Sequence, residues 1–124
     1  MTWWWPLGAL WSLPGSILGL LISLVCRPSS LRWSDGAVVI RVRKCIPAMA
    51  CAQTWGVVIL ATVAGDTPGI LRHERRHVLQ WFVLGPLFLL AYPLCSLYAW
   101  MRGGDGYRDN PLEADARRAA GEGG

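Results

Sequence analysis

The chain contains two histidines, and both lie in the segment His73-Glu74-Arg75-Arg76-His77. On a helix, residues four apart lie on the same face, so the two imidazoles could reach one metal ion. Glu74 lies about 100° around the helix from His73, which suits a base acting on a water better than a third ligand. The His-Glu-x-x-His pattern is typical of zinc hydrolases, in which two histidines hold the ion and the glutamate is the general base.

A second interpretation of this segment needs no metal. A pattern with three fixed positions also occurs by chance, and the arginines around the motif could make the helix an ordinary basic surface. Gln80 favours the metal site, because it lies seven residues after His73 on the same helical face. From there its side chain could hydrogen-bond a metal-binding histidine and orient the ring.

The composition indicates a membrane protein. The 124 residues allow one small domain, yet 53% of them are apolar, only 16% are charged, and eight are tryptophan. A soluble domain of this size would need more charge to cover its surface. The net charge is +4, and no basic tract is interleaved with aromatic residues, so we expect no nucleic-acid partner.

The four cysteines, Cys26, Cys45, Cys51 and Cys95, are scattered among apolar residues. They form no Cys-x-x-Cys pair, which argues against a zinc site built from cysteine. Buried free thiols are the simpler interpretation. A disulfide bond between Cys45 and Cys51 is left open.

The first apolar stretch, residues 3–26, has 24 positions without a charged side chain. That length is enough to cross a hydrocarbon core of about 30 Å as a helix. We therefore predict a transmembrane anchor over residues 1–27, with Trp3 to Trp5 at one interface, Arg27 at the other and a kink at Pro14. A cleaved signal peptide is the alternative, but the stretch lacks a basic start and a small-x-small cleavage site.

Two strands are expected after a polar connector over residues 27–36. The β-branched residues and alternating arginines of residues 37–43 predict a half-exposed strand, and residues 54–63 predict a second, more buried one. We expect them to form a small antiparallel sheet. A further membrane span is the competing interpretation of residues 45–65, although Pro47, Gln53 and Gly56 interrupt it.

Three helices should follow. Thr67 is expected to be the N-cap and Pro68 the first residue of the helix that carries the motif, which should end near Gly85. Residues 86–101 predict an almost uncharged helix. Asn110-Pro111 should begin a short last helix that reaches residue 120, and residues 121–124 are expected to be disordered.

Several motifs together resemble a known family. The pattern His73-Glu74-x-x-His77-x-x-Gln80 is followed by Gly85-Pro86-Leu87-Phe88 and by Tyr107-Arg108-Asp109-Asn110-Pro111-x-Glu113-x-x-Ala116. It resembles a family of small bacterial membrane-associated proteins whose motif helix is similar to that of gluzincin-type zinc metallopeptidases. The resemblance covers residues 54–116 and implies a zincin-like domain over residues 28–120. It departs from the wider gluzincin pattern at Arg117, where an aspartate often follows the alanine.

The resemblance also implies that Glu113, in its Glu-x-x-Ala setting on a later helix, is the third metal ligand. The alternative is a capping box, in which Glu113 reaches back to the backbone amide of Asn110. We favour the ligand, because two histidines and one glutamate form a known ligand set of catalytic zinc. Asp115 is the fallback ligand, although it points well away from Glu113 around the helix.

A three-ligand site restricts the membrane topology. If residues 78–101 crossed the bilayer, His77 and Glu113 would lie on opposite sides and could not share an ion. The breaks at Gly85-Pro86 and Pro93 favour a hairpin, since about 15 residues of return helix cover roughly 22 Å. We therefore predict one true span, at the N-terminus, with the later apolar helices partly dipped into the bilayer. The twelve Lys and Arg residues of the chain, among them Arg27, Arg32, Arg41, Arg43, Lys44, Arg72, Arg75 and Arg76, all follow that span, which predicts that the remainder lies in the cytoplasm.

The sequence thus predicts an α+β, membrane-anchored zinc metallohydrolase, a peptidase by resemblance. His73, His77 and Glu113 would bind Zn²⁺, and Glu74 would act as general base on the zinc-activated water. Tyr107 or Arg108 would contact the oxyanion or the substrate. The strand over residues 57–63 could accept an extended peptide, so the bilayer and a peptide or protein substrate are the expected partners.

Two other classes of protein stay open at this stage. One is a non-enzymatic membrane protein in which zinc ties the last helix to the motif helix. In the other there is no metal, and the histidines are polar residues at a membrane interface.

Overall fold

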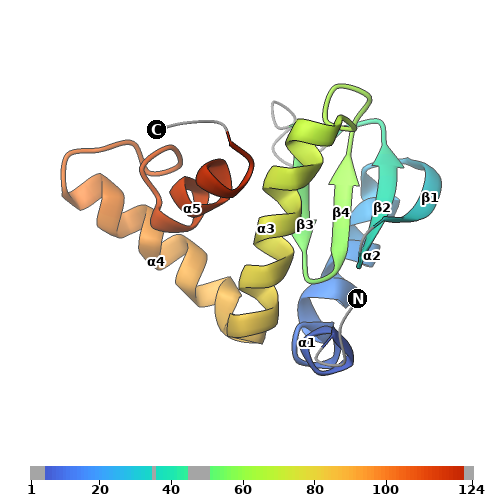
Figure 1. The fold of residues 1–124 in the computed structure, drawn as a ribbon, viewed down its shortest axis with the longest axis horizontal. Coiled ribbons are helices and arrows are strands. Elements are labelled where there is room, and N and C mark those ends of the chain that lie inside the picture. Colours follow the sequence, from blue (N-terminus) through green and yellow to red (C-terminus); the bar gives the residue numbers. More distant parts are fainter. Residues whose placement is uncertain (1–4, 35, 45–50, 122–124) are drawn as a thin grey trace.

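The computed structural model describes residues 5–34, 36–44 and 51–121, which form a mixed α+β fold (Figure 1). The helices are α1 (Trp5–Trp11), α2 (Leu13–Val25), α3 (Pro68–Leu84), α4 (Phe88–Met101) and α5 (Pro111–Ala119), and a short 3-10 helix, η1 (Gly85–Leu87), joins α3 to α4. The strands are β1 (Pro28–Ser34), β2 (Ala37–Val42), β3 (Ala52–Trp55) and β4 (Val58–Ala61). The α+β class predicted from the sequence is therefore confirmed.

The sheet is mixed, so the prediction of an antiparallel sheet is wrong. Its strand order is β1-β2-β4-β3. β1 pairs antiparallel with β2, and β3 pairs antiparallel with β4, but β2 and β4 run parallel, with Val38 opposite Val58 and Ile40 opposite Leu60. The parallel pair arises because β3 takes the outer position and leaves a space beside β2, into which β4 then returns.

Two strand boundaries also differ from the prediction. The expected polar connector forms the edge strand β1, whose backbone pairs with β2 along one side although six of its seven residues are exposed. The single strand expected over residues 54–63 is instead a hairpin that turns at Gly56, where φ is +61°. A side chain there would be strained, and its Cβ would lie 2.3 Å from Ser16 Oγ on α2. The strands β3 and β4 also replace the membrane span considered for this region.

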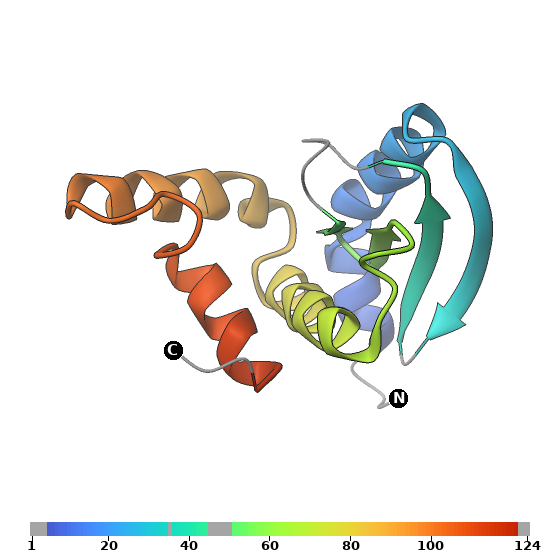
Figure 2. The ribbon, with the colours of Figure 1, turned by 90° about the horizontal axis from the view of Figure 1, so that it is seen from above.

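The sheet is sandwiched between α2 and α3 (Figure 2). Because side chains alternate along a strand, Val39 and Ile59 pack with Leu71 and Val78 of α3, whereas the intervening residues face α2. The second cluster contains Cys26, Ile40, Val42, Val58 and Leu60. Both faces of the sheet are thus buried, as is usual where strands run parallel.

The N-terminal stretch is two helices rather than one straight anchor. α1 and α2 are bent by 67° at a break that includes Ser12, two residues before the predicted kink. Pro14 explains the break, because its ring removes the N–H that would bond back to the preceding turn. The small residues of α2 face the protein interior: a Cβ at Gly15 would meet Trp81, and one at Gly19 would meet Trp55. Trp3 and Trp4 lie outside the described residues.

Within the described residues, the helical run Pro68–Met101 is long and apolar enough to cross a membrane, and the bent pair α1 and α2 is a second candidate. The charged residues of this run lie in its first third, at Arg72, Glu74, Arg75 and Arg76. Its apolar part therefore begins after His77. Only Phe88 and Ala99 of α4 are buried, so most of this uncharged helix is exposed.

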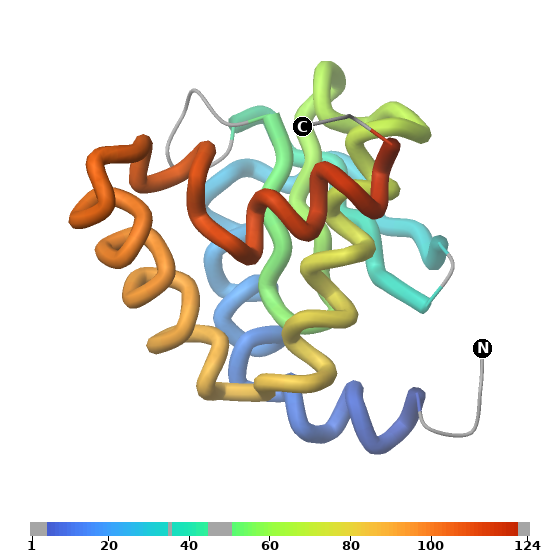
Figure 3. Tube along the Cα trace, turned by 60° about the vertical axis from the view of Figure 1, so that its left-hand side comes forward, coloured from blue at the N-terminus to red at the C-terminus, as the bar shows by residue number. Residues whose placement is uncertain are grey.

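The motif helix has the predicted ends. Thr67 Oγ1 accepts a hydrogen bond from Ile70 N at 3.3 Å, and Pro68 is the first helical residue. The helix stops at Leu84 because Gly85 adopts a φ of +57°. α4 then runs back from η1, and α5 returns to lie across α3 (Figure 3).

The loop before α3 is fixed to the sheet by an ion cluster. Asp66 accepts hydrogen bonds from Arg32 Nη1 at 2.9 Å and from Arg41 Nε at 3.1 Å. These hydrogen bonds, from Arg32 and then Arg41, lower the pKa of Asp66 to about 2. The cluster joins β1, β2 and the start of the motif helix.

The described cysteines, Cys26, Cys51 and Cys95, have free thiols that take no part in this ion cluster, and Cys45 lies outside the described residues.

We expect Asp66→Asn to lower the free energy of unfolding at pH 7 by about 1 kcal/mol, a value reduced because Arg32 is partly exposed. The pKa of Asp66 is depressed in the folded state, so its contribution is complete above pH 4 and is lost as the pH falls toward 2. Urea unfolding in detergent micelles should show that the difference in free energy of unfolding between wild type and variant becomes smaller as the pH falls from 4 to 2. A gap of constant size from pH 7 to pH 2.5 would contradict this assignment.

Candidate metal centre

The two histidines lie one turn apart on α3 and are both buried. Their rings meet edge to face, with centroids 5.1 Å apart. Among the described residues, a ring nitrogen of His73, a ring nitrogen of His77 and a carboxylate oxygen of Glu74 all lie within 4.8 Å of one another. The motif helix therefore presents a compact group of donor atoms, as its spacing predicts.

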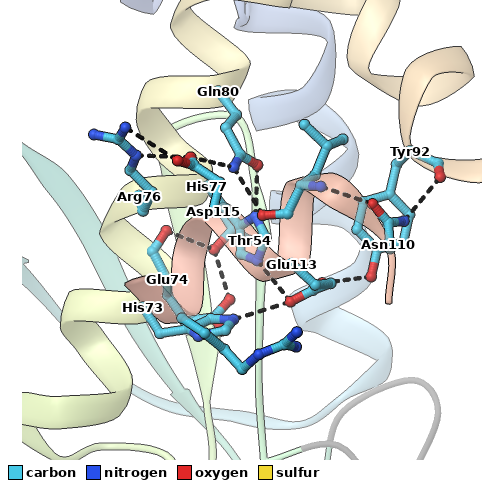
Figure 4. Close-up of polar contacts among 12 residues, drawn as sticks. Thr54, His73, Glu74, Arg76, His77, Gln80, Tyr92, Asn110, Glu113 and Asp115 are labelled. Carbon is cyan, nitrogen blue, oxygen red and sulfur yellow. Dashed lines mark hydrogen bonds and ion pairs between the residues drawn. The ribbon is translucent and has the colours of Figure 1, made fainter. Parts of the chain in front are cut away.

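Glu113 reaches this group from α5 (Figure 4). Its Oε1 lies 2.9 Å from His73 Nε2 and 3.1 Å from His77 Nε2, and the residue is 4% exposed. Two zinc ligands about 2.1 Å from the ion at a tetrahedral angle lie roughly 3.4 Å apart. A small outward movement of these side chains would therefore admit an ion. The chain turns away from α3 through η1 and α4, and α5 then brings Glu113 back to the side of α3 on which the histidines lie (Figure 1).

Gln80 fixes the hydrogen position on His77. Its Nε2 donates to the Leu112 carbonyl oxygen at 2.9 Å and to Asp115 Oδ2 at 3.0 Å, and both partners can only accept. The amide oxygen must therefore face His77, whose Nδ1 lies 2.8 Å away. His77 consequently carries a hydrogen on Nδ1, and in the neutral ring the lone pair of Nε2 is directed at Glu113.

This arrangement supplies a test of whether a metal ion fits. A neutral His77 would set the Nε2 lone pair against a carboxylate oxygen at 3.1 Å, so that two acceptors face each other. A cation or an additional proton is needed between them. Two imidazoles and a carboxylate are the donors that Zn²⁺ prefers. The residues present therefore fit a zinc ion.

Glu74 is the second buried carboxylate of the site, and Thr54 of β3 holds it. Thr54 Oγ1 lies 2.8 Å from Glu74 Oε1, to which it can donate. Burial raises the pKa of Glu74 above its ordinary value, although the charge of His77 and the bond from Thr54 act in the opposite direction. A carboxylate with a raised pKa, close to two imidazoles, is suited to accept a proton.

Glu113 has a different electrostatic environment. Burial raises its pKa, but the contacts with His73 and His77, when their Nε2 atoms carry protons, outweigh that effect and hold the pKa well below the ordinary range. Its second oxygen, Oε2, accepts a hydrogen bond from the Tyr92 hydroxyl. Glu113 is therefore the anion of the site, and the two carboxylates have clearly different proton affinities.

Asn110, Glu113 and Asp115 of α5 and its cap have different partners. Asn110 caps α5 through a 2.9 Å bond from Leu112 N to its Oδ1, while the Glu113 carboxylate turns toward the histidines. Asp115 does not reach the imidazoles: it accepts from Arg76 Nε at 2.8 Å and from Gln80. The structure thus brings Glu113, and not Asp115, to the motif.

Tyr107 and Arg108 lie on the loop before α5, and both are exposed. Partial desolvation of its phenol, with the negative charges of Glu113 and Glu74, raises the pKa of Tyr107 to about 12. Tyr107 is therefore within electrostatic reach of the site. The hydrogen bonds described for Arg108 involve its backbone, with Asp105 and Arg117.

Two residues of the site were not found from the sequence. Thr54 belongs to no recognisable motif, and its contact with Glu74 depends on the position of β3 relative to α3. Tyr92 had a weak signal, because it is one of three hydroxyl-bearing residues, with Ser96 and Tyr98, on a mostly apolar helix. No known protein family, curated protein or solved structure matches this chain.

We expect Gln80→Met to lower zinc affinity about 10-fold to 100-fold, because it removes the acceptor that holds the Nδ1–H of His77. Competition with a chromophoric chelator would measure the change. Leu79→Met, at the neighbouring exposed position, is the matched control and should bind as the wild type does. Equal affinities of the two variants would show that Gln80 does not set the state of His77.

Proposed function

We propose that this protein is a membrane-associated zinc metallohydrolase and that its substrate is a peptide. The observation that carries the proposal is the approach of Glu113 Oε1 to the Nε2 atoms of His73 and His77, with Glu74 alongside. Metal-assisted hydrolysis needs such an arrangement: two buried imidazoles and two carboxylates, one with a raised and one with a lowered pKa.

Each residue then has a defined task. His73, His77 and Glu113 would hold the ion, and Gln80 would orient His77. A bound Zn²⁺ would acidify a water and polarise the carbonyl to be attacked. Glu74 would take the proton of that water and pass it to the leaving amine. Thr54 would keep the Glu74 carboxylate directed into the site.

The expected peptide position has to be moved from β4 to β3. β4 lies between β2 and β3 and has no free edge, whereas β3 is hydrogen-bonded to a described strand on one side only. β3 also carries Thr54, which contacts Glu74. An extended peptide added to β3 would bring its backbone beside the general base.

The membrane would supply the surroundings of the apolar helices. α4 is uncharged and largely exposed, and α2 exposes Ile17, Leu21 and Leu24 on the side away from the sheet. Lipid would cover these faces, so that their apolar side chains would not be exposed to water. The basic residues that follow α2 support a cytoplasmic position for the site, because positive charge is enriched on that side of a membrane.

A structural metal is the second candidate, because a Glu74 oxygen lies within 4.8 Å of both imidazoles. If Glu74 bound the ion together with His73, His77 and Glu113, four protein ligands would close the site. A closed site would tie α5 to α3 and leave no position for water. The two candidates therefore assign Glu74 different roles.

Glu74→Gln separates them. We expect the variant to keep one zinc per chain and to lose turnover of a fluorogenic peptide library by about 10²-fold to 10⁴-fold, the usual size of a general-base effect. His73→Ala should lose both zinc and turnover. Arg72→Gln, an exposed neighbour on the same helix, serves as control. Loss of zinc in Glu74→Gln would favour the structural site, and undiminished turnover would exclude the hydrolytic mechanism.

A further inference from the structure

Tyr92 reaches the candidate metal centre from the apolar helix α4 (Figure 4). Its hydroxyl donates to Glu113 Oε2, while Glu113 Oε1 faces both imidazoles. Its ring centroid lies 6.4 Å from that of His77 and 5.6 Å from that of Phe88. The two oxygens of one buried carboxylate are therefore engaged from opposite sides.

The position of Tyr92 is itself fixed by a buried amide. Asn110 is fully buried, and its Nδ2 donates to the Tyr92 carbonyl oxygen at 3.1 Å and to Ser96 Oγ at 2.9 Å. Its Oδ1 caps α5 through Leu112 N. All hydrogen-bonding groups of this side chain are used, so α4 and α5 are joined within one turn of Glu113.

We infer that Tyr92 is a positioning residue that restricts Glu113 to offering one oxygen, Oε1, to a metal ion. The inference rests on the proposed metal site. A carboxylate with both oxygens free can bind an ion through two atoms, which uses a position that water would otherwise take. Because Tyr92 holds Oε2, Glu113 binds through one atom, and the position for water is preserved.

Cobalt substitution tests this inference, because the visible absorbance of Co²⁺ falls when four-coordination changes to five-coordination. We expect Co²⁺-loaded Tyr92→Phe, in detergent micelles, to absorb more weakly than Co²⁺-loaded wild type and to bind Zn²⁺ about 10-fold less tightly. Tyr98→Phe is the matched control: it removes a hydroxyl from the same helix whose hydrogen bond is with Arg102. This control should leave both measurements unchanged.

The origin of the effect is tested in a second background. In Glu113→Ala, the additional change Tyr92→Phe should no longer alter Co²⁺ or Zn²⁺ affinity, because the carboxylate through which Tyr92 acts is absent. A loss of affinity as large as in the wild-type background would overturn the inference. It would mean that Tyr92 acts through general packing of α4.

A measurement on the full-length protein without a change at Tyr92 covers the case in which that variant does not fold. The chain has three tyrosines, so fluorotyrosine labelling gives three ¹⁹F signals, which Tyr98→Phe and Tyr107→Phe assign. Addition of Zn²⁺ should shift the Tyr92 signal and leave the Tyr98 signal in place. A stationary Tyr92 signal would overturn the inference.

The results also separate this inference from the proposed function. Wild-type protein that takes up no Co²⁺ or Zn²⁺ would remove the metal site and, with it, both proposals. Wild-type protein that binds one ion through His73, combined with unchanged absorbance and affinity in Tyr92→Phe, would remove only the role of Tyr92.

Discussion

The site depends on one electrostatic constraint: a buried carboxylate, Glu113, faces the nitrogen atoms of two imidazoles. An isolated buried charge is costly unless it is paired, so whatever positive charge lies between these groups stabilises the contact of α5 with α3. Because Gln80 commits the hydrogen of His77 to Nδ1, the ring cannot satisfy Glu113 in its neutral form. The proposed metal ion and the packing of the last helix are therefore two aspects of the same requirement.

The remaining structure places the groups that meet this requirement. α3 is fixed between the sheet and α5, and its buried face contains the histidines, Glu74 and Gln80 on one side and apolar residues on the other. α4 supplies Tyr92 and brings the chain back, while Asn110 joins α4 to α5. Each of the two carboxylates accepts a hydrogen bond from a hydroxyl group: Glu74 from Thr54, and Glu113 from Tyr92.

Sequence reasoning worked where local spacing determines the outcome. The four-residue interval of the histidines, the cap at Thr67, the glycine at the end of α3 and the Asn110-Pro111 start are short-range signals, and the structure has each of them. The convergence with Glu113 was expected from a family resemblance and from the ligand set of two histidines and one glutamate that is known for catalytic zinc. A shared ion also required the chain to return after α3, and α5 does bring Glu113 back to the histidines.

Long-range placement could not be read in the same way. The parallel pairing of β2 with β4 depends on the space that β3 leaves, which no local pattern encodes. Residues 28–34 have little apolar character and form a strand because they pair with β2. Thr54 and Tyr92 enter the site through tertiary packing, since neither belongs to the motif. The first helix broke because Pro14 and the fit of small residues against Trp81 and Trp55 favoured packing on the sheet.

The close fit of α2 against the sheet has a further consequence. Gly15 and Gly19 lie directly against Trp81 of α3 and Trp55 of β3, so this helix is packed on the domain over much of its length. With α2 seated in lipid, as proposed, the scissile bond would have to arrive at a fixed height above the bilayer surface. The position of cleavage would then depend more on the distance of the bond from the membrane than on the side chains around that bond.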